Sequence, residues 1–246
     1  MIHPSIHCFD TVVSTNDIAI NMAKCGASEG TIVVAKQQTK GRGRRGKVWL
    51  DEPGQCLLMS VVLRPDKRAD ELSQLTFVAS LSVAEVLHQL GLQASLKWPN
   101  DVYVQGRKIA GILLEVAFCD TRPAVVIGIG MNINQTSFPD NIADTATSIA
   151  IETKKQIDPD YVANLLIDIL FANYEKCLTN GFDDILIRWQ MHMWGVGSNA
   201  EVISQGNNIK GTIIGIDARG ALMLKNRRGY VHEILAADAV NLRVNK

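Results

Sequence analysis

The most basic segment of the chain, KQQTKGRGRRGKVWL at residues 36–50, gathers its cations within eight positions: Lys40, Arg42, Arg44, Arg45 and Lys47. Guanidinium groups offer forked donors that match carboxylate and phosphate oxygens. The glycines between them, Gly41 and Gly43, let the backbone approach a ligand closely. The segment therefore suits an anion-binding loop. On these residues alone, a solvent-exposed basic turn and an arginine–glycine RNA-binding segment stay open as alternatives.

A second polar group lies in KWPNDVYVQGRKIAGILLE, residues 97–115. Its polar members fall at the ends of predicted strands: Lys97, Asn100, Asp101, Arg107 and Lys108. Its apolar members would supply a buried wall: Ile109, Ile112, Leu113 and Leu114. Polar groups above an apolar trough are typical of a small-molecule pocket. The alternatives are an ordinary turn after Pro99 and a surface lysine at position 108.

Other motifs carry less information. Gly128 and Gly130 in VVIGIGMNIN predict bulges or points of close backbone approach within a strand. No third glycine follows and no helix begins there, so a dinucleotide-binding fold is excluded. STN at 14–16 is typical of a helix cap when taken alone. The chain has no H-E-x-x-H, G-x-S-x-G or G-x-x-x-x-G-K-[ST] motif, and its five histidines are scattered, which argues against zinc protease, serine hydrolase and P-loop chemistry.

Sequence periodicity predicts the elements that position these residues. A helix that starts with a Ser14–Asp17 capping box should run to Gly26, and a longer helix should span 71–91. Strands are predicted over 30–37, 54–65, 94–98 and 124–134, with a hairpin over 102–118 that turns at Gly106. Helices over 158–178, capped by Asp158, and over 182–193 should cover one face of the sheet.

The pattern changes from about Gly197 to short β-rich runs separated by turn residues, which predicts a small β-barrel. We therefore expect two domains. A mixed α/β (α+β) domain would occupy residues 1–195, and a small β domain would occupy residues 196–246.

Composition limits the class of protein. The 25 Lys and Arg residues balance the 25 Asp and Glu residues, so the basic surface of a general nucleic-acid binder is missing and any anion site must be local. The five cysteines contain no C-x-x-C pair, which argues against a disulfide framework and a zinc site. The chain shows no signal-peptide pattern and no apolar run of membrane-spanning length. We expect a cytoplasmic protein with no membrane contact and no metal-ligating cluster.

Taken together, five blocks resemble the biotin protein ligase family in their order: STN at 14–16, Q-T-K-GRGRRG at 38–46, KWPND at 97–101, GRKIAGILLE at 106–115 and VIGIGMNIN at 126–134. The GRGRRG loop with KWPND and a following K-x-x-G is the specific part. The resemblance implies a catalytic domain of the class II synthetase and biotin ligase type, followed by an SH3-like barrel. It also implies ATP-dependent biotinylation of a lysine on a carrier domain, such as the biotin carboxyl carrier protein of acetyl-CoA carboxylase, through biotinyl-5′-AMP and with Mg²⁺.

The resemblance also assigns site residues. Biotin would contact Ser14, Thr15, Asn16, Gln38, Arg42, Gly43, Arg44, Lys108 and Gly111. ATP would contact Arg42, Arg44, Arg45, Asn100, Asp101, Lys108 and Asn132, with Asn100 and Asp101 also serving Mg²⁺. Lys108 and Arg44 would act in catalysis, because fixed cations stabilise negative charge that builds up on the α-phosphate. The reaction needs no enzyme nucleophile, which agrees with the missing motifs.

Two departures from the family pattern carry expectations. Lys40 stands where small residues are frequent in the family. The first block begins at Ser14, which leaves no room for the N-terminal winged-helix domain of the family's bifunctional repressors, so we expect no sequence-specific DNA binding. Like charges and glycines predict that residues 39–47 are disordered without ligand. A lipoate or octanoate ligase of related fold and a biotin sensor without turnover stay open as alternatives, and both a homodimer and a monomer are compatible with the sequence.

Overall fold

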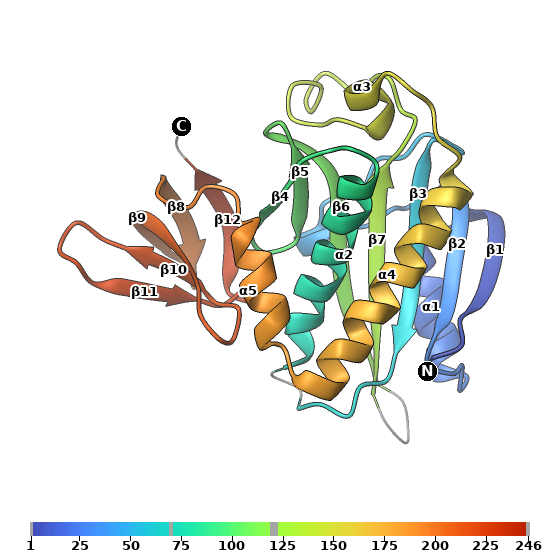
Figure 1. The fold of residues 1–246 in the computed structure, drawn as a ribbon, viewed down its shortest axis with the longest axis horizontal. Coiled ribbons are helices and arrows are strands. Elements are labelled where there is room, and N and C mark those ends of the chain that lie inside the picture. The colour runs from blue at the N-terminus through green and yellow to red at the C-terminus, as the bar shows by residue number, and fades with distance from the viewer. Residues whose placement is uncertain (1, 69–70, 119–122, 245–246) are drawn as a thin grey trace.

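The computed structural model describes residues 2–68, 71–118 and 123–244, which form two β-sheets and their covering helices (Figure 1). Seven strands build the larger sheet: β1 (Ser5–Val12), β2 (Thr31–Gln38), β3 (Cys56–Leu63), β4 (Ala94–Lys97), β5 (Asp101–Val104), β6 (Arg107–Ala117) and β7 (Ala124–Asn132). Their order is β1-β2-β3-β7-β6-β5-β4. Only β1 and β2 run parallel, and every other neighbouring pair is antiparallel. The predicted mixed α/β class is confirmed.

The central strand β3 is buried along its whole length. Its sequence CLLMSVVL is a nearly continuous apolar run, which is typical of a strand covered on both faces of its sheet. Helix α1 (Thr15–Lys24) packs on one face of the sheet, and α2 (Leu75–Gln89) and α4 (Pro159–Asn180) pack on the other. Helix α2 is buried on most sides because it also contacts α4 and α5 (Asp183–Met191). Short elements complete the domain: α3 (Ile149–Thr153) and the 3-10 turns at Arg44–Gly46 and Leu72–Gln74.

Most sequence-based elements are present, with three corrections. Helix α1 begins after Ser14, but the capping box is wrong: the Ser14 side chain makes no capping hydrogen bond, and the Asp17 carboxylate accepts from Arg42 instead. Helix α5 packs on α2, α4 and strand β9 of the second sheet rather than on the large sheet. Strand β1 and helix α3 were not predicted. By contrast, the Asp158 cap of α4 is confirmed, because its side chain accepts from the Asp160 amide.

The hairpin between β5 and β6 turns at the predicted position. Gln105 and Gly106 adopt φ values of 50° and 76°. Two consecutive residues with positive φ are the requirement of the two-residue turn that matches strand twist. The tight turn places Lys108 on β6 across from Tyr103 on β5, two pairs along the ladder from Asp101 and its partner Gly111.

The second sheet is antiparallel throughout, with the order β11-β10-β9-β8-β12. Its strands are β8 (Asn199–Ser204), β9 (Asn207–Ile216), β10 (Leu222–Lys225), β11 (Val231–Ile234) and β12 (Ala239–Val244). It corresponds to the predicted small β domain, although β12 was not anticipated. Met193 still forms a β-bridge with Leu96 of the large sheet, and β8 begins at Asn199. The division into two domains at residue 195 stays a prediction.

The small sheet is fixed to the large domain through the β9–β10 turn. Trp98 Nε1 donates to the Gly220 carbonyl at 3.0 Å, and Gln74 Nε2 donates to the Ala218 carbonyl at 2.9 Å. A Cβ at Gly220 would lie 2.4 Å from the Phe77 ring, so the two surfaces meet closely there. Of the helices in the described ranges, none combines the length and the apolar character that crossing a bilayer requires.

Candidate active site

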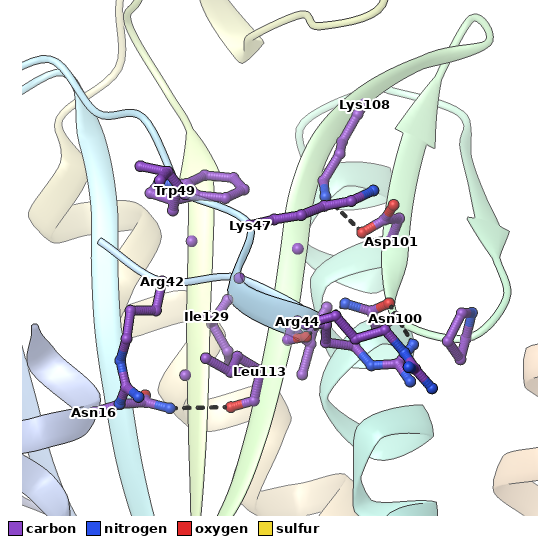
Figure 2. Close-up of a pocket in the computed structure, with 18 of the residues that line it drawn as sticks. Asn16, Arg42, Arg44, Lys47, Trp49, Asn100, Asp101, Lys108, Leu113 and Ile129 are labelled. Atoms are coloured by element: carbon purple, nitrogen blue, oxygen red, sulfur yellow. Dashed lines mark hydrogen bonds and ion pairs between the residues drawn. The ribbon is translucent and has the colours of Figure 1, made fainter. Parts of the chain in front are cut away.

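A cavity of about 210 Å³ opens above β6 and β7, under the loop that joins β2 to β3 (Figure 2). All of the sequence-predicted site residues except Asn132 line it: Ser14, Thr15, Asn16, Gln38, Arg42, Gly43, Arg44, Arg45, Asn100, Asp101, Lys108 and Gly111. They come from segments far apart in the chain, which the sheet order brings together. Apolar walls are supplied by Leu58, Ile112, Leu113 and Ile129.

One end of the cavity is polar and largely enclosed. The Thr15 amide donates to Gln38 Oε1 at 2.8 Å, and the Thr15 hydroxyl lies 3.1 Å from the same oxygen. This arrangement occupies the carbonyl side of the Gln38 amide. Within the described part of the chain, Gln38 Nε2 and the buried Ser14 hydroxyl have no hydrogen-bond partner, so a donor and a hydroxyl stay available to a ligand.

Asn16 lies at the same end, but the protein uses its whole amide. Its Oδ1 is 2.6 Å from the Ser60 hydroxyl, and its Nδ2 donates to the Leu113 carbonyl at 3.3 Å and to Glu115 Oε2 at 2.7 Å. One acceptor and two donors are therefore engaged. Asn16 acts as a support for the pocket wall, and its predicted contact with biotin stays a prediction. The side chain fits because position 128 is glycine: a Cβ there would lie 2.2 Å from Asn16 Oδ1.

Paired glycines form the floor of the cavity. Gly111 on β6 faces Gly130 on β7, and the indole of Trp49 lies over both. A Cβ at Gly130 would lie 2.6 Å from Trp49 Cε2, so Gly130, one of the two glycines predicted to allow close approach, admits an aromatic ring. The pairing with β6 shows no bulge at these positions. Trp49 Nε1 is buried without a hydrogen-bond partner in the described residues, and sequence analysis did not identify this residue as part of the site.

The opposite end of the cavity is cationic. Lys108 Nζ pairs with Asp101 Oδ1 at 2.6 Å and lies 5.7 Å from the centre of the Trp49 ring. Figure 2 shows Lys108 directed toward Asp101 at one end, with Arg42 beside Asn16 at the other. Asn100 Nδ2 donates to the Ile112 carbonyl at 2.7 Å, which fixes the turn after Pro99 at the base of this cluster.

Cations at this end exceed the acidic groups that could balance them. Desolvation is the main cause that lowers the pKa of Lys97; Asp101 opposes it, while Lys108 and Lys47 reinforce it. Burial and the nearby charge of Arg45 likewise lower the pKa of Arg44. Among the described lining residues, Asp101 is the one carboxylate. This end of the cavity therefore favours a ligand with several negative charges.

The arginine loop contacts the second sheet. Arg44 Nη2 donates to the Ala236 carbonyl at 2.6 Å, and Arg45 Nη2 donates to the Ala237 carbonyl at 2.6 Å. Ala239 and Leu242 of the same sheet line the cavity. The small β domain thus forms part of the pocket wall, which nothing in its sequence signalled.

Two predicted residues take other positions. Arg42 pairs with Asp17 at 2.6 Å and with Glu115 at 2.9 Å, so it closes the polar end rather than the cationic end. Asn132 lies outside the lining and donates to the Thr147 carbonyl at 2.9 Å. Their predicted contacts with ATP stay predictions.

The family model for the biotin/lipoate A/B protein ligase family matches residues 8–132, which contain most of this cavity's lining. The chain belongs to this family. The resemblance predicted from the five sequence blocks is confirmed.

Individual ligases of the family align with most of the chain. The bifunctional ligase/repressor BirA of Bacillus spizizenii is 36% identical over 233 residues, which cover 93% of this chain and 71% of that protein. The biotin--[acetyl-CoA-carboxylase] ligase of Paracoccus denitrificans is 34% identical and covers 88% of this chain and 92% of that protein. The solved biotin protein ligase of Aquifex aeolicus in complex with biotin and ATP superposes with a TM-score of 0.87 at 31% identity, over 98% of this chain and 99% of that chain.

The donor set also suits the magnesium ion that ATP chemistry in this ligase family implies. Mg²⁺ is usually held by one or two carboxylates, water and the phosphates of its nucleotide. Asp101 supplies one carboxylate at the cationic end, with the Asn100 side chain beside it. The described residues contain no group of three His, Cys, Asp or Glu side chains that could bind a metal by themselves, so these residues would hold the ion only together with the nucleotide.

Proposed function

We propose that the chain is a biotin protein ligase that activates biotin with ATP and transfers it to a lysine of a carrier domain. The observation that carries this proposal is one trough with two chemically different ends. Its polar end has Gln38 Nε2 and the Ser14 hydroxyl, which have no partner among the described residues. Its cationic end has Lys108, Arg44 and Lys97 around Asp101. Family membership and the biotin and ATP named for the Aquifex aeolicus structure support the same assignment.

The length of the trough fits a long carboxylic acid with a polar head group. From Lys108 to Leu113 the strand β6 advances five residues, or roughly 16 Å at about 3.3 Å per residue. An acid that lies along this strand would place its head group beside Gln38 and its carboxylate beside Lys108. A ureido ring has both donors and an acceptor, and it suits the polar end better than the hydrocarbon or dithiolane end of octanoate or lipoate.

The first chemical step forms a mixed anhydride. A carboxylate oxygen of biotin attacks the α-phosphorus of ATP, the bond from that phosphorus to the bridging oxygen breaks, and pyrophosphate leaves with the electron pair. Both reactants are anionic, so Lys108 and Arg44 would lower the barrier by holding the reacting oxygens and by opposing the charge that grows on the α-phosphate. Bound Mg²⁺ would neutralise part of the triphosphate charge beside Asp101.

The second step needs an acceptor amine. The amine of a carrier-domain lysine attacks the acyl carbon, the bond to AMP breaks, and one proton is released as the amide forms. We propose that the carrier resembles the biotin carboxyl carrier protein of an acetyl-CoA carboxylase, because the Paracoccus denitrificans relative is named for that enzyme. We also propose that the protein acts in the cytoplasm, where ATP is available. We further propose a homodimer built on an open strand edge, such as that of β1.

The decisive experiment is mass spectrometry of the purified protein after incubation with ATP, Mg²⁺ and equal amounts of biotin, lipoate and octanoate. We expect retained biotinyl-adenylate. Lipoyl- or octanoyl-adenylate would move the chain to the other branch of its family. Bound biotin without adenylate would indicate a sensor and overturn the proposal. Light scattering of the same sample tests the dimer.

A further inference from the structure

Strand β3 contains one hydroxyl side chain, Ser60, that has no role in the reaction proposed above. Ser60 is completely buried among the apolar residues of this central strand. A buried hydroxyl costs free energy unless it is hydrogen-bonded, so its partners show what it supports. Both partners belong to the STN segment: Ser60 Oγ lies 2.6 Å from Asn16 Oδ1 and 2.8 Å from Thr15 Oγ1.

The hydrogens of this network can be placed by elimination. The Asn16 amide cannot be reversed, because Nδ2 donates to Leu113 and Glu115. Its oxygen only accepts, so the single proton of Ser60 must point to Asn16. Ser60 therefore meets Thr15 as an acceptor, and the Thr15 hydroxyl proton is drawn to the 2.8 Å contact with Ser60 rather than to the 3.1 Å contact with Gln38.

This arrangement leaves lone pairs of Thr15 Oγ1 as an acceptor at the polar end of the cavity, beside the donor Gln38 Nε2. We propose that Ser60 is a positioning residue: it holds Thr15 as an acceptor and so sets the polar end to recognise a head group that has an N–H donor next to a carbonyl. The proposal deepens the proposed function, because it assigns the discrimination of a ureido ring to a residue that does not touch the ligand.

A double-mutant cycle on biotin binding tests the proposal. The variants are Ser60→Ala, Thr15→Val and their combination, with biotin affinity measured by titration calorimetry without ATP. Each single variant should bind biotin about tenfold more weakly, the effect of one neutral hydrogen bond. If Ser60 acts through Thr15, the combined variant should lie within about threefold of Thr15→Val, because residues that act as one unit are not additive. In turnover assays the KM for biotin should rise, while kcat and the KM for ATP hold.

Ser82→Ala is the matched control, because Ser82 is a fully buried serine on α2 whose hydroxyl contacts Val78 and Asn173 away from the cavity. It should leave biotin affinity unchanged and combine additively with Thr15→Val. If Ser60→Ala does not fold, Ser60→Cys keeps the volume with a weaker donor and should show the same loss. Wild-type protein that does not bind biotin would defeat the proposed function itself. Wild-type binding with an unchanged Ser60 variant, or an additive cycle, would overturn this inference alone.

Discussion

Replacing Gly128 with alanine should displace the Asn16 side chain at the polar end of the cavity and destabilise the protein. The new Cβ would lie 2.2 Å from Asn16 Oδ1 and 2.9 Å from Asn16 Cγ. Carbon and its neighbours pack best at about 3.5 Å, so the amide would have to move by about 1.3 Å. Such a movement breaks the 2.6 Å contact with Ser60 and disturbs both Nδ2 bonds, because the Asn16 amide is held on three sides.

The cost has two parts. Inserting a methyl group into a packed site typically costs about 1–3 kcal/mol. Leaving a buried polar group without its partner costs about 1–3 kcal/mol more. The sum is about 2–6 kcal/mol of unfolding free energy. For a protein of this size, the lower half of that range corresponds to a fall in Tm of about 5–15 °C.

Gly130→Ala is the informative counterpart. Its Cβ would lie 2.6 Å from Trp49, but Trp49 belongs to the β2–β3 loop, which can lift away. We expect calorimetry to give a large fall in Tm for Gly128→Ala and a small one for Gly130→Ala. Biotin affinity should fall in the first variant and ATP affinity in the second. Equal Tm values for the two variants, or unchanged biotin affinity in Gly128→Ala, would refute the reasoning.

The remaining predictions concern charge, protons and mobility. Lys108→Ala should lower the rate of adenylate formation about 10²–10³-fold, as expected for the loss of one preorganised donor. A pyrophosphate-release assay measures this rate, and Lys210→Ala at an exposed position is the control that should have no effect. Near-normal pyrophosphate release by Lys108→Ala would contradict a catalytic role for Lys108. Arg44→Gly should loosen retention of the adenylate, and unchanged selectivity of lysine labelling would count against this. Burial raises the pKa of the Cys56 thiol to about 12 and the pKa of the Cys177 thiol to about 11. Above pH ~9 these thiols are therefore deprotonated in the unfolded chain but still protonated in the folded protein. Each thiol then lowers the unfolding free energy by about 1.4 kcal/mol per pH unit. Cys56→Ala should flatten that slope in urea titrations, and an identical slope would exclude the thiol as its source. Trypsin should cut at Arg44 and Arg45 more slowly with biotin and ATP than without them. Equal rates of cutting would contradict the prediction that residues 39–47 become ordered when ligand binds.

Local sequence signals predicted the site well where a residue type has few uses. A dense run of arginine and glycine between two apolar strands marked the loop, and the turn at Gly106 placed Lys108 at the start of its strand. The glycines at 128 and 130 were correctly interpreted as points of close approach. In each case the local pattern and the final packing make the same demand on the residue.

Other residues gave no local signal. Strand β1 is exposed along most of its length, so it lacks the alternation that predicts a strand. Nothing in the sequence around Ser60 indicates a role, because its partners Thr15 and Asn16 contact it only in the folded protein. Leu242 and Ala239 reach the cavity only because the two sheets dock, which is a tertiary property. Cys119, one of the five cysteines, lies outside the described residues.

The contacts between the arginine loop and the second sheet have a practical consequence for mutational screens. Ala236 and Ala237 accept hydrogen bonds from Arg44 and Arg45 through backbone carbonyls, which every residue type possesses. Both positions are already alanine, so an alanine scan would pass over them, and most other substitutions would keep the acceptors. A screen based on side chains would therefore record this contact between the loop and the second sheet as unimportant. Insertions or deletions that shift the turn by one residue would reveal it.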